Sequence, residues 1–115
     1  MTTNPKASWT KVCGKDDLVP HSGVAALIQN QQVALFYIPG FEEEVFAVGN
    51  HDPFSGANII ARGLIGDRQG EPMVASPLYK QHFSLKSGLC FEDNEVNLPV
   101  WPIRLKGHVV EILQS

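Results

Sequence analysis

The 115-residue chain has no apolar run long enough to cross a membrane, and its first eight residues are polar. A membrane-spanning helix needs about 20 consecutive apolar residues, and a secretory signal peptide needs an apolar segment near the N-terminus. The sequence therefore predicts a cytoplasmic protein with no place in a bilayer.

Cysteine is also scarce, since only Cys13 and Cys90 occur and neither belongs to a CxxC pair. A disulfide between them is possible by count, but thiols in the cytoplasm are kept reduced. We expect both cysteines to be small apolar residues of the core.

Basic residues are not in excess, because 9 Lys and Arg face 12 Asp and Glu, for a net charge of −3. This balance provides no positive field for nucleic acid or for an anionic membrane surface. The chain also lacks the G-x-G-x-x-G dinucleotide fingerprint. One acidic run, Glu42–Glu44, fits either a solvated strand entry or a contact with a basic partner.

The hydrophobic content of 43% and charged content of 18% are those of a folded globular chain, here one domain over residues 1–115. No segment keeps the i, i+3, i+4, i+7 spacing of a helix, whereas short β-rich segments recur. We therefore predict an all-β antiparallel sandwich. The expected strands are Trp9–Cys13, Val24–Ile28, Val33–Ile38, Glu44–Val48, Glu71–Ala75, Phe83–Leu85, Leu98–Leu105 and His108–Ile112.

The connections between these strands carry turn residues. Gln29–Gln32 predicts the turn of one hairpin, and Lys106-Gly107 predicts that of the last hairpin. Val33–Ile38 is apolar on both faces, so this strand is expected between two layers. Asn58–Arg68 indicates a turn and a short strand, and Asp93–Asn97 an exposed loop.

The segment 50–88 contains two proline loops, Asp52-Pro53-Phe54 and Ser76-Pro77-Leu78-Tyr79. Their layout resembles the cluster-binding region of Rieske iron–sulfur domains, which reads C-x-H in one loop and C-P-x-H in the other. The resemblance places Asp52 and Ser76 at the two cysteine positions, and Phe54 and Tyr79 at the two histidine positions. It implies a small loop-rich subdomain, 50–88, on a core sandwich formed by 8–49 and 89–113.

A Rieske [2Fe–2S] centre needs two thiolates on one iron and two imidazoles on the other. A carboxylate is a hard ligand where a soft sulfur is required, and Phe54 and Tyr79 offer no imidazole nitrogen. The resemblance therefore implies a Rieske-like fold with no cluster and no other metal, in which Asp52 and Ser76 face each other across the two loops.

The resemblance extends to both ends of the chain, through Trp9–Val12, Phe83–Gly88 and Leu98–Leu105. Asp-Pro-Phe and Ser-Pro-Leu-Tyr-Lys-Gln are similar to the loops of small subunits of bacterial assimilatory NADH-dependent nitrite reductases. This similarity implies a large partner subunit that carries FAD, sirohaem and an iron–sulfur cluster and reduces nitrite to ammonium. It implies no cofactor and no catalytic residue in this chain.

At the tip of the two loops, the candidates for partner binding are Pro53, Phe54, Pro77, Leu78 and Tyr79. Aromatic and apolar side chains at an exposed tip favour a protein interface. Alternatively, Phe54 and Tyr79 point inward and fill the volume of the missing cluster, because a void there would be destabilising. Both hypotheses remain open.

Two further functions are considered. His51, His82 and Asp52 could mimic a two-histidine, one-carboxylate iron site, although ordinary hydrogen-bonded histidines are the simpler interpretation. Such a site would make the chain an unusual metal-binding electron carrier. A free-standing interaction module on the same fold is the other alternative to a nitrite reductase subunit.

Overall fold

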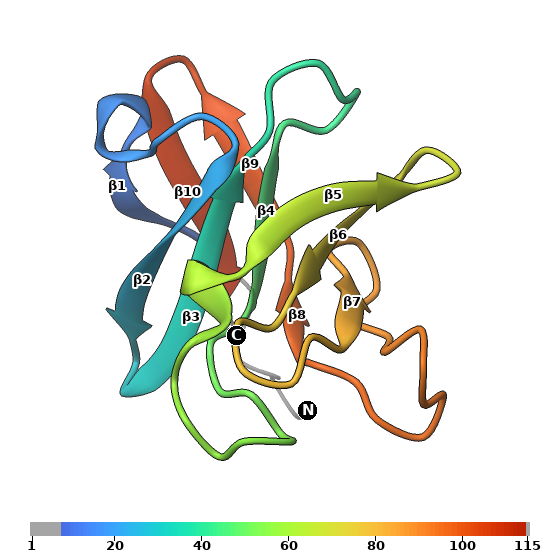
Figure 1. The fold of residues 1–115 in the computed structure, drawn as a ribbon. Coiled ribbons are helices and arrows are strands. Elements are labelled where there is room, and N and C mark those ends of the chain that lie inside the picture. The colour runs from blue at the N-terminus through green and yellow to red at the C-terminus, as the bar shows by residue number, and fades with distance from the viewer. Residues whose placement is uncertain (1–7, 115) are drawn as a thin grey trace, which may run out of the picture.

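The computed structural model describes residues 8–114. Ten strands and two short 3-10 turns make up this part of the chain (Figure 1). In chain order they are β1 (Ser8–Gly14), η1 (Lys15–Asp17), β2 (Ser22–Ile28), β3 (Gln31–Tyr37), β4 (Val45–Gly49), η2 (Ile60–Arg62), β5 (Leu64–Arg68), β6 (Glu71–Ala75), β7 (His82–Ser84), β8 (Val100–Trp101), β9 (Ile103–Lys106) and β10 (Val109–Gln114).

The strands form three antiparallel sheets, ordered β1-β10-β9, β2-β3-β4-β8 and β5-β6-β7. The all-β prediction is confirmed. No helix within residues 8–114 is long and apolar enough to cross a membrane.

The strand β3 lies in the middle of the four-stranded sheet, between β2 and β4 (Figure 1). Its residues alternate between two faces, as the two-residue period of a strand requires. Val33 and Leu35 pack in one core with Val110 of β10, and Ala34 and Phe36 pack in another core with Phe83. The prediction that this strand is buried on both faces is confirmed, and the four-stranded sheet is the middle layer.

The first hairpin turn is shorter than predicted. Ile28 pairs with Gln31, so only Gln29 and Asn30 form the turn between β2 and β3. Both have positive φ, 49° and 64°, which is the pattern of a two-residue type I′ turn. Gln31 and Gln32 belong to β3, and the expected four-residue connection was wrong.

The last hairpin is shifted by one residue from its prediction. Lys106 pairs with Val109, so the turn consists of Gly107 and His108, and His108 does not begin the strand. Gly107 has φ +64°. A positive φ at the first turn position is typical of a type II′ turn, which favours glycine there.

The predicted strand Leu98–Leu105 is two strands, β8 and β9, separated at Pro102. β8 pairs with β4 in the middle sheet, whereas β9 pairs with β10 in the outer sheet. Proline has no N–H to donate to a ladder, and the chain changes sheet where that donor is missing. The single long strand was therefore wrong.

The segment after β7 stays close to it through single bridges from Phe83 to Cys90 and from Leu89 to Asn97. The division of the chain at residues 50 and 88 remains a proposal. Cys90 is buried and Cys13 is partly buried; both are free thiols and belong to different cores.

Candidate functional site: the paired loops

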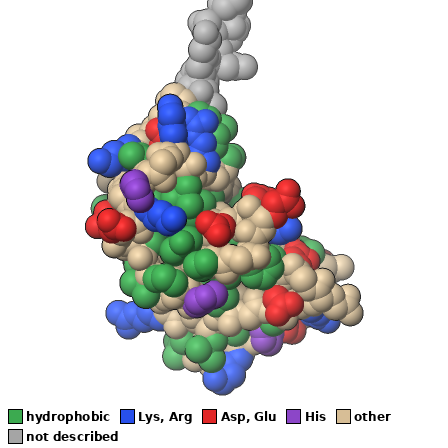
Figure 2. All heavy atoms as spheres, turned by 90° about the horizontal axis from the view of Figure 1, so that it is seen from above, with side chains coloured by type: hydrophobic (Ala, Val, Ile, Leu, Met, Phe, Trp, Pro, Cys, Tyr) green, Lys and Arg blue, Asp and Glu red, His purple; other side chains and the backbone are tan. Residues whose placement is uncertain are grey.

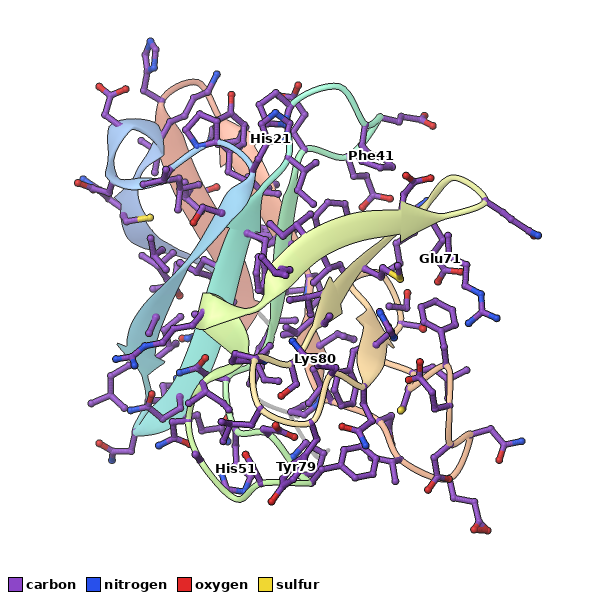
Figure 3. All side chains as sticks on the ribbon, in the orientation of Figure 1. His21, Phe41, His51, Glu71, Tyr79 and Lys80 are labelled. Atoms are coloured by element: carbon purple, nitrogen blue, oxygen red, sulfur yellow. The ribbon has the colours of Figure 1, made fainter. Side chains whose placement is uncertain are left out.

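The two proline loops both follow strands at one end of the molecule. We call residues 52–57 and 76–81 the paired loops. Figure 3 shows His51 and Tyr79 at this end, with His21 and Phe41 at the opposite end. Loop 52–57 comes shortly after β4, and loop 76–81 connects β6 to β7.

The paired loops have the same backbone hydrogen bonds. Asp52 N donates to Ala57 O at 2.8 Å, and Asp52 O accepts from Gly56 N at 2.8 Å. Ser76 makes the equivalent two bonds, as donor to the residue five positions on at 2.9 Å and as acceptor from the residue four positions on at 3.1 Å. Two segments 24 residues apart thus adopt one loop conformation.

The fifth residue of each loop has a left-handed backbone. Gly56 has φ +78° and Lys80 has φ +63°. Glycine adopts this conformation readily, whereas a residue with a Cβ is strained in it. The lysine is held there by the hydrogen bonds of its loop.

Asp52 and Ser76 join the two loops. Ser76 Oγ donates to Asp52 Oδ2 at 2.5 Å, and Phe54 N donates to Asp52 Oδ1 at 2.9 Å. Both residues are fully buried, with 0% of Asp52 and 1% of Ser76 exposed. The expectation that these two side chains face each other is confirmed.

Burial raises the pKa of the Asp52 carboxyl, but hydrogen bonds from Ser76, Phe54 and Ser55 lower it by more, so the net pKa lies below its usual value. Donors aimed at the charged form favour that form. Asp52 is therefore an ionised, buried carboxylate at neutral pH, and hydrogen bonds from residues of the two loops stabilise its charge.

Phe54 and Tyr79 point in different directions. The Phe54 ring packs against the core, with its centroid 6.2 Å from that of Phe83 and the planes at 46°. Tyr79 is 61% exposed and the neighbouring Leu78 is 59% exposed. The inward hypothesis therefore describes Phe54, and the outward hypothesis describes Tyr79.

The structure does not bring His51, His82 and Asp52 together as ligands. His51 Nδ1 lies 3.1 Å from Asn58 Oδ1, and His82 Nδ1 lies 2.6 Å from Glu92 Oε2. Between residues 8 and 114, no three His, Cys, Asp or Glu side chains are grouped as a metal site would require.

Sequence reasoning missed Asn50, which is 2% exposed and precedes the first loop. Its Nδ2 donates to Gln32 Oε1 at 3.3 Å, and its Oδ1 accepts from Ala61 N at 2.7 Å. It ties the β2–β3 hairpin to η2. A polar residue directly after the buried β4 was the available signal.

Glu92 was missed as well. Its carboxylate accepts from His82 N at 2.7 Å and contacts the His82 ring, and Cys90 Sγ donates to it at 3.7 Å. It therefore fixes the start of β7, where loop 76–81 ends. Ten residues separate the carboxylate from the histidine, so no local pattern indicated this contact.

The side chains of the paired loops do not fit a Rieske cluster. At the four positions stand a hydrogen-bonded carboxylate, a serine hydroxyl, a core phenyl ring and a phenol, where two thiolates and two imidazoles are needed. The thiols lie elsewhere, Cys13 in β1 and Cys90 beside Glu92.

Residues 8–113 match the family described as Rieske-like [2Fe-2S] domain. The nitrite reductase (NADH) small subunit of Escherichia coli K12 is 43% identical over 106 residues, which cover 92% of this chain and 97% of that protein. The solved structure of the E. coli protein NirD superimposes with a TM-score of 0.84 at 41% identity, covering 96% of this chain and 99% of that one.

Two further similarities are of different kinds. The nitrite reductase [NAD(P)H] large subunit of Klebsiella oxytoca is 37% identical over 102 residues, which are 89% of this chain but only 10% of that protein. The ferredoxin of carbazole 1,9a-dioxygenase from Nocardioides aromaticivorans has a TM-score of 0.78 at 15% identity, covering 94% of this chain and 99% of that one, and shows the fold alone. With a Rieske-like domain over nearly its whole length and relatives of similar length that it matches almost throughout, the chain belongs to the family of the small subunits of NADH-dependent nitrite reductase.

Proposed function

We propose that this chain is a non-catalytic small subunit that docks by its paired loops onto the large subunit of an NADH-dependent nitrite reductase. The observation that carries the proposal is the exposure of Leu78 and Tyr79, 59% and 61%, on a loop whose backbone is fixed by hydrogen bonds. An apolar tip that is already ordered loses little conformational entropy on association.

The exposed docking residues are Pro53, Pro77, Leu78 and Tyr79. Prolines and an aromatic side chain give contact area with few rotatable bonds, which suits a protein interface. Phe54 supports this surface from inside, because its ring packs on the core. In this proposal no residue of the chain touches the reacting nitrogen species.

The Klebsiella relative supports a role beside the large subunit. In that protein a similar domain makes up 10% of a chain named as the large subunit. A covalent link keeps two modules at high effective concentration. Two separate chains need a docking surface to reach the same arrangement, and the paired loops provide one.

The proposal assigns FAD, sirohaem and an iron–sulfur cluster to the large subunit, in a cytoplasmic, assimilatory pathway from nitrite to ammonium. This chain contributes no cluster, since the donors of its paired loops do not suit one. The purified small subunit should be colourless and free of acid-labile sulfide. Two irons and two sulfides per chain would contradict this part of the proposal.

The docking surface is tested by Leu78→Asp. A carboxylate at this exposed site leaves the fold intact, but it would be desolvated in an apolar interface. We expect the affinity for the large subunit to fall about tenfold or more, measured by titration of the purified chains.

Val19→Asp is the matched control, because Val19 is 54% exposed in the connection between η1 and β2. Figure 2 looks onto the end of the molecule opposite the paired loops, where hydrophobic side chains lie among charged ones. Equal weakening by both variants, or by neither, would count against docking through the paired loops. Wild-type protein that does not bind the large subunit would favour a free-standing interaction module.

A further inference from the structure

A groove of about 490 Å³ lies beside the first of the paired loops. It extends from the β2–β3 hairpin, across the end of β4, to β8. Most of its lining surface is apolar, and the apolar side chains there are Pro53, Leu98, Pro99 and Trp101. The side-chain amides of Gln31, Gln32, Asn58 and Asn97 also line it.

The groove is uncharged in a chain that carries 21 acidic and basic residues. Among residues 8–114, none that lines it is Asp, Glu, Lys or Arg, and His51 is the one histidine of this lining. The His51 ring contacts Asn58, which is also in the groove. A charged ligand would find no Asp, Glu, Lys or Arg among these residues to pair with, so the chemistry of the groove favours an uncharged ligand.

The groove is continuous with the proposed docking surface, because Pro53 belongs to both. A mostly apolar lining that also contains amide groups suits an extended peptide. The apolar side chains of the groove would contact apolar side chains of the peptide, and each amide offers both a donor and an acceptor to peptide backbone groups. A partner seated on the paired loops would place its neighbouring chain over this groove.

We propose that the groove binds an extended, uncharged segment of the large subunit while the paired loops dock beside it. This inference rests on the proposed function and adds to it a second contact and the chemistry of the segment. The two contacts together orient the small subunit, since a single tip contact leaves rotation about the tip unrestrained.

Isosteric charge substitutions test the groove. The double variant Gln31→Glu, Asn97→Asp replaces two exposed amides of the groove by carboxylates of the same shape. An uncharged segment would bury them without a counter-charge, which is unfavourable. We expect the affinity for the large subunit to fall about tenfold or more, with the denaturation midpoint unchanged.

The matched control is Gln69→Glu, Asn94→Asp, which makes the same chemical change at two exposed residues that do not line the groove. Its affinity should stay within about twofold of wild type. If the two double variants weaken binding equally, net charge rather than the groove is responsible and the inference is wrong.

Hydrogen exchange of the complex gives a second measurement. Backbone amides of residues 49–52 and 97–101, apart from Pro99, which has no N–H, should exchange more slowly when the large subunit is added. If wild type binds but the groove variant binds equally well and these amides stay unprotected, the groove inference fails while docking by the paired loops stands. If wild type does not bind at all, the proposed function fails with it.

Discussion

At the scale of single residues, the central feature is a buried carboxylate that forms no ion pair within the described residues 8–114. Asp52 has no exposed surface, and its oxygens accept from the Ser76 hydroxyl and the Phe54 amide. In a Rieske protein a cluster bridges the two loops. Here a single hydrogen bond to a charged acceptor makes the connection between side chains.

Ser76→Ala should therefore destabilise the protein by about 2 kcal/mol, because it leaves a buried carboxylate oxygen unsatisfied. The free energy of unfolding in urea measures the effect. Ser87→Ala is the control, since the Ser87 hydroxyl only accepts from Leu89 N at 3.2 Å at an exposed turn, and it should cost clearly less. Equal losses in the two variants would show that the contact between the loops has no special role.

The sequence allowed the positions of Asp52 and Ser76 to be predicted, because the two proline loops match a known pattern. The directions of Phe54 and Tyr79 could not be predicted in the same way. Phe54 packs on Phe83, 29 residues away, and only the arrangement of the third sheet decides that contact. The contact between His82 and Glu92 likewise could not be predicted from the sequence, because it depends on how the chain folds back after β7.

At the scale of elements, periodicity identified most strands but not their ends. Alternating apolar residues in the sequence show where a half-buried strand lies. Where the strand ends depends on which residues form the turn, and that depends on their backbone φ. The first hairpin has a two-residue turn because Gln29 and Asn30 both adopt positive φ. The Gln-Asn pair is a weaker sequence signal for such a turn than Asn-Gly. Pro102 was a signal for the end of a strand that pattern reasoning passed over.

Substitution of two glycines distinguishes the effect of backbone strain from that of a steric clash. Gly56 and Gly88 have φ +78° and +79°. A Cβ at Gly56 meets nothing within 4 Å, but at Gly88 it would lie 2.1 Å from Leu98 O. Gly56→Ala should cost about 1 kcal/mol of unfolding free energy, and Gly88→Ala substantially more.

Denaturation midpoints of the two variants measure this order, and failure of the Gly88 variant to fold agrees with it. If Gly56→Ala is the more damaging change, the loop conformation described for residues 52–57 is wrong.

At the scale of the whole molecule, acid stability depends on carboxylates held in the ionised form. For Asp52 and Glu92, burial raises the pKa, but hydrogen bonds from neighbouring groups lower it by more. A carboxyl whose pKa is lower in the folded than in the unfolded chain adds stability above its unfolded pKa, and this is lost as the pH falls through the folded pKa.

The free energy of unfolding should therefore fall below about pH 4. Asp52→Asn should reduce this pH dependence, because the neutral amide does not titrate, while lowering stability at neutral pH. Urea denaturation between neutral and acidic pH measures both effects. Identical pH profiles for wild type and Asp52→Asn would show that the Asp52 carboxylate does not contribute.

The position of β3 between two cores affects how the protein unfolds and how it is degraded. Its alternating residues serve both cores, so neither core can loosen without displacing the backbone on which the other depends. Melting should be one cooperative event. A protease acting on the isolated subunit would then find either the folded, resistant chain or the fully unfolded chain. It would leave no partly digested fragment that could still bind the large subunit without supporting it.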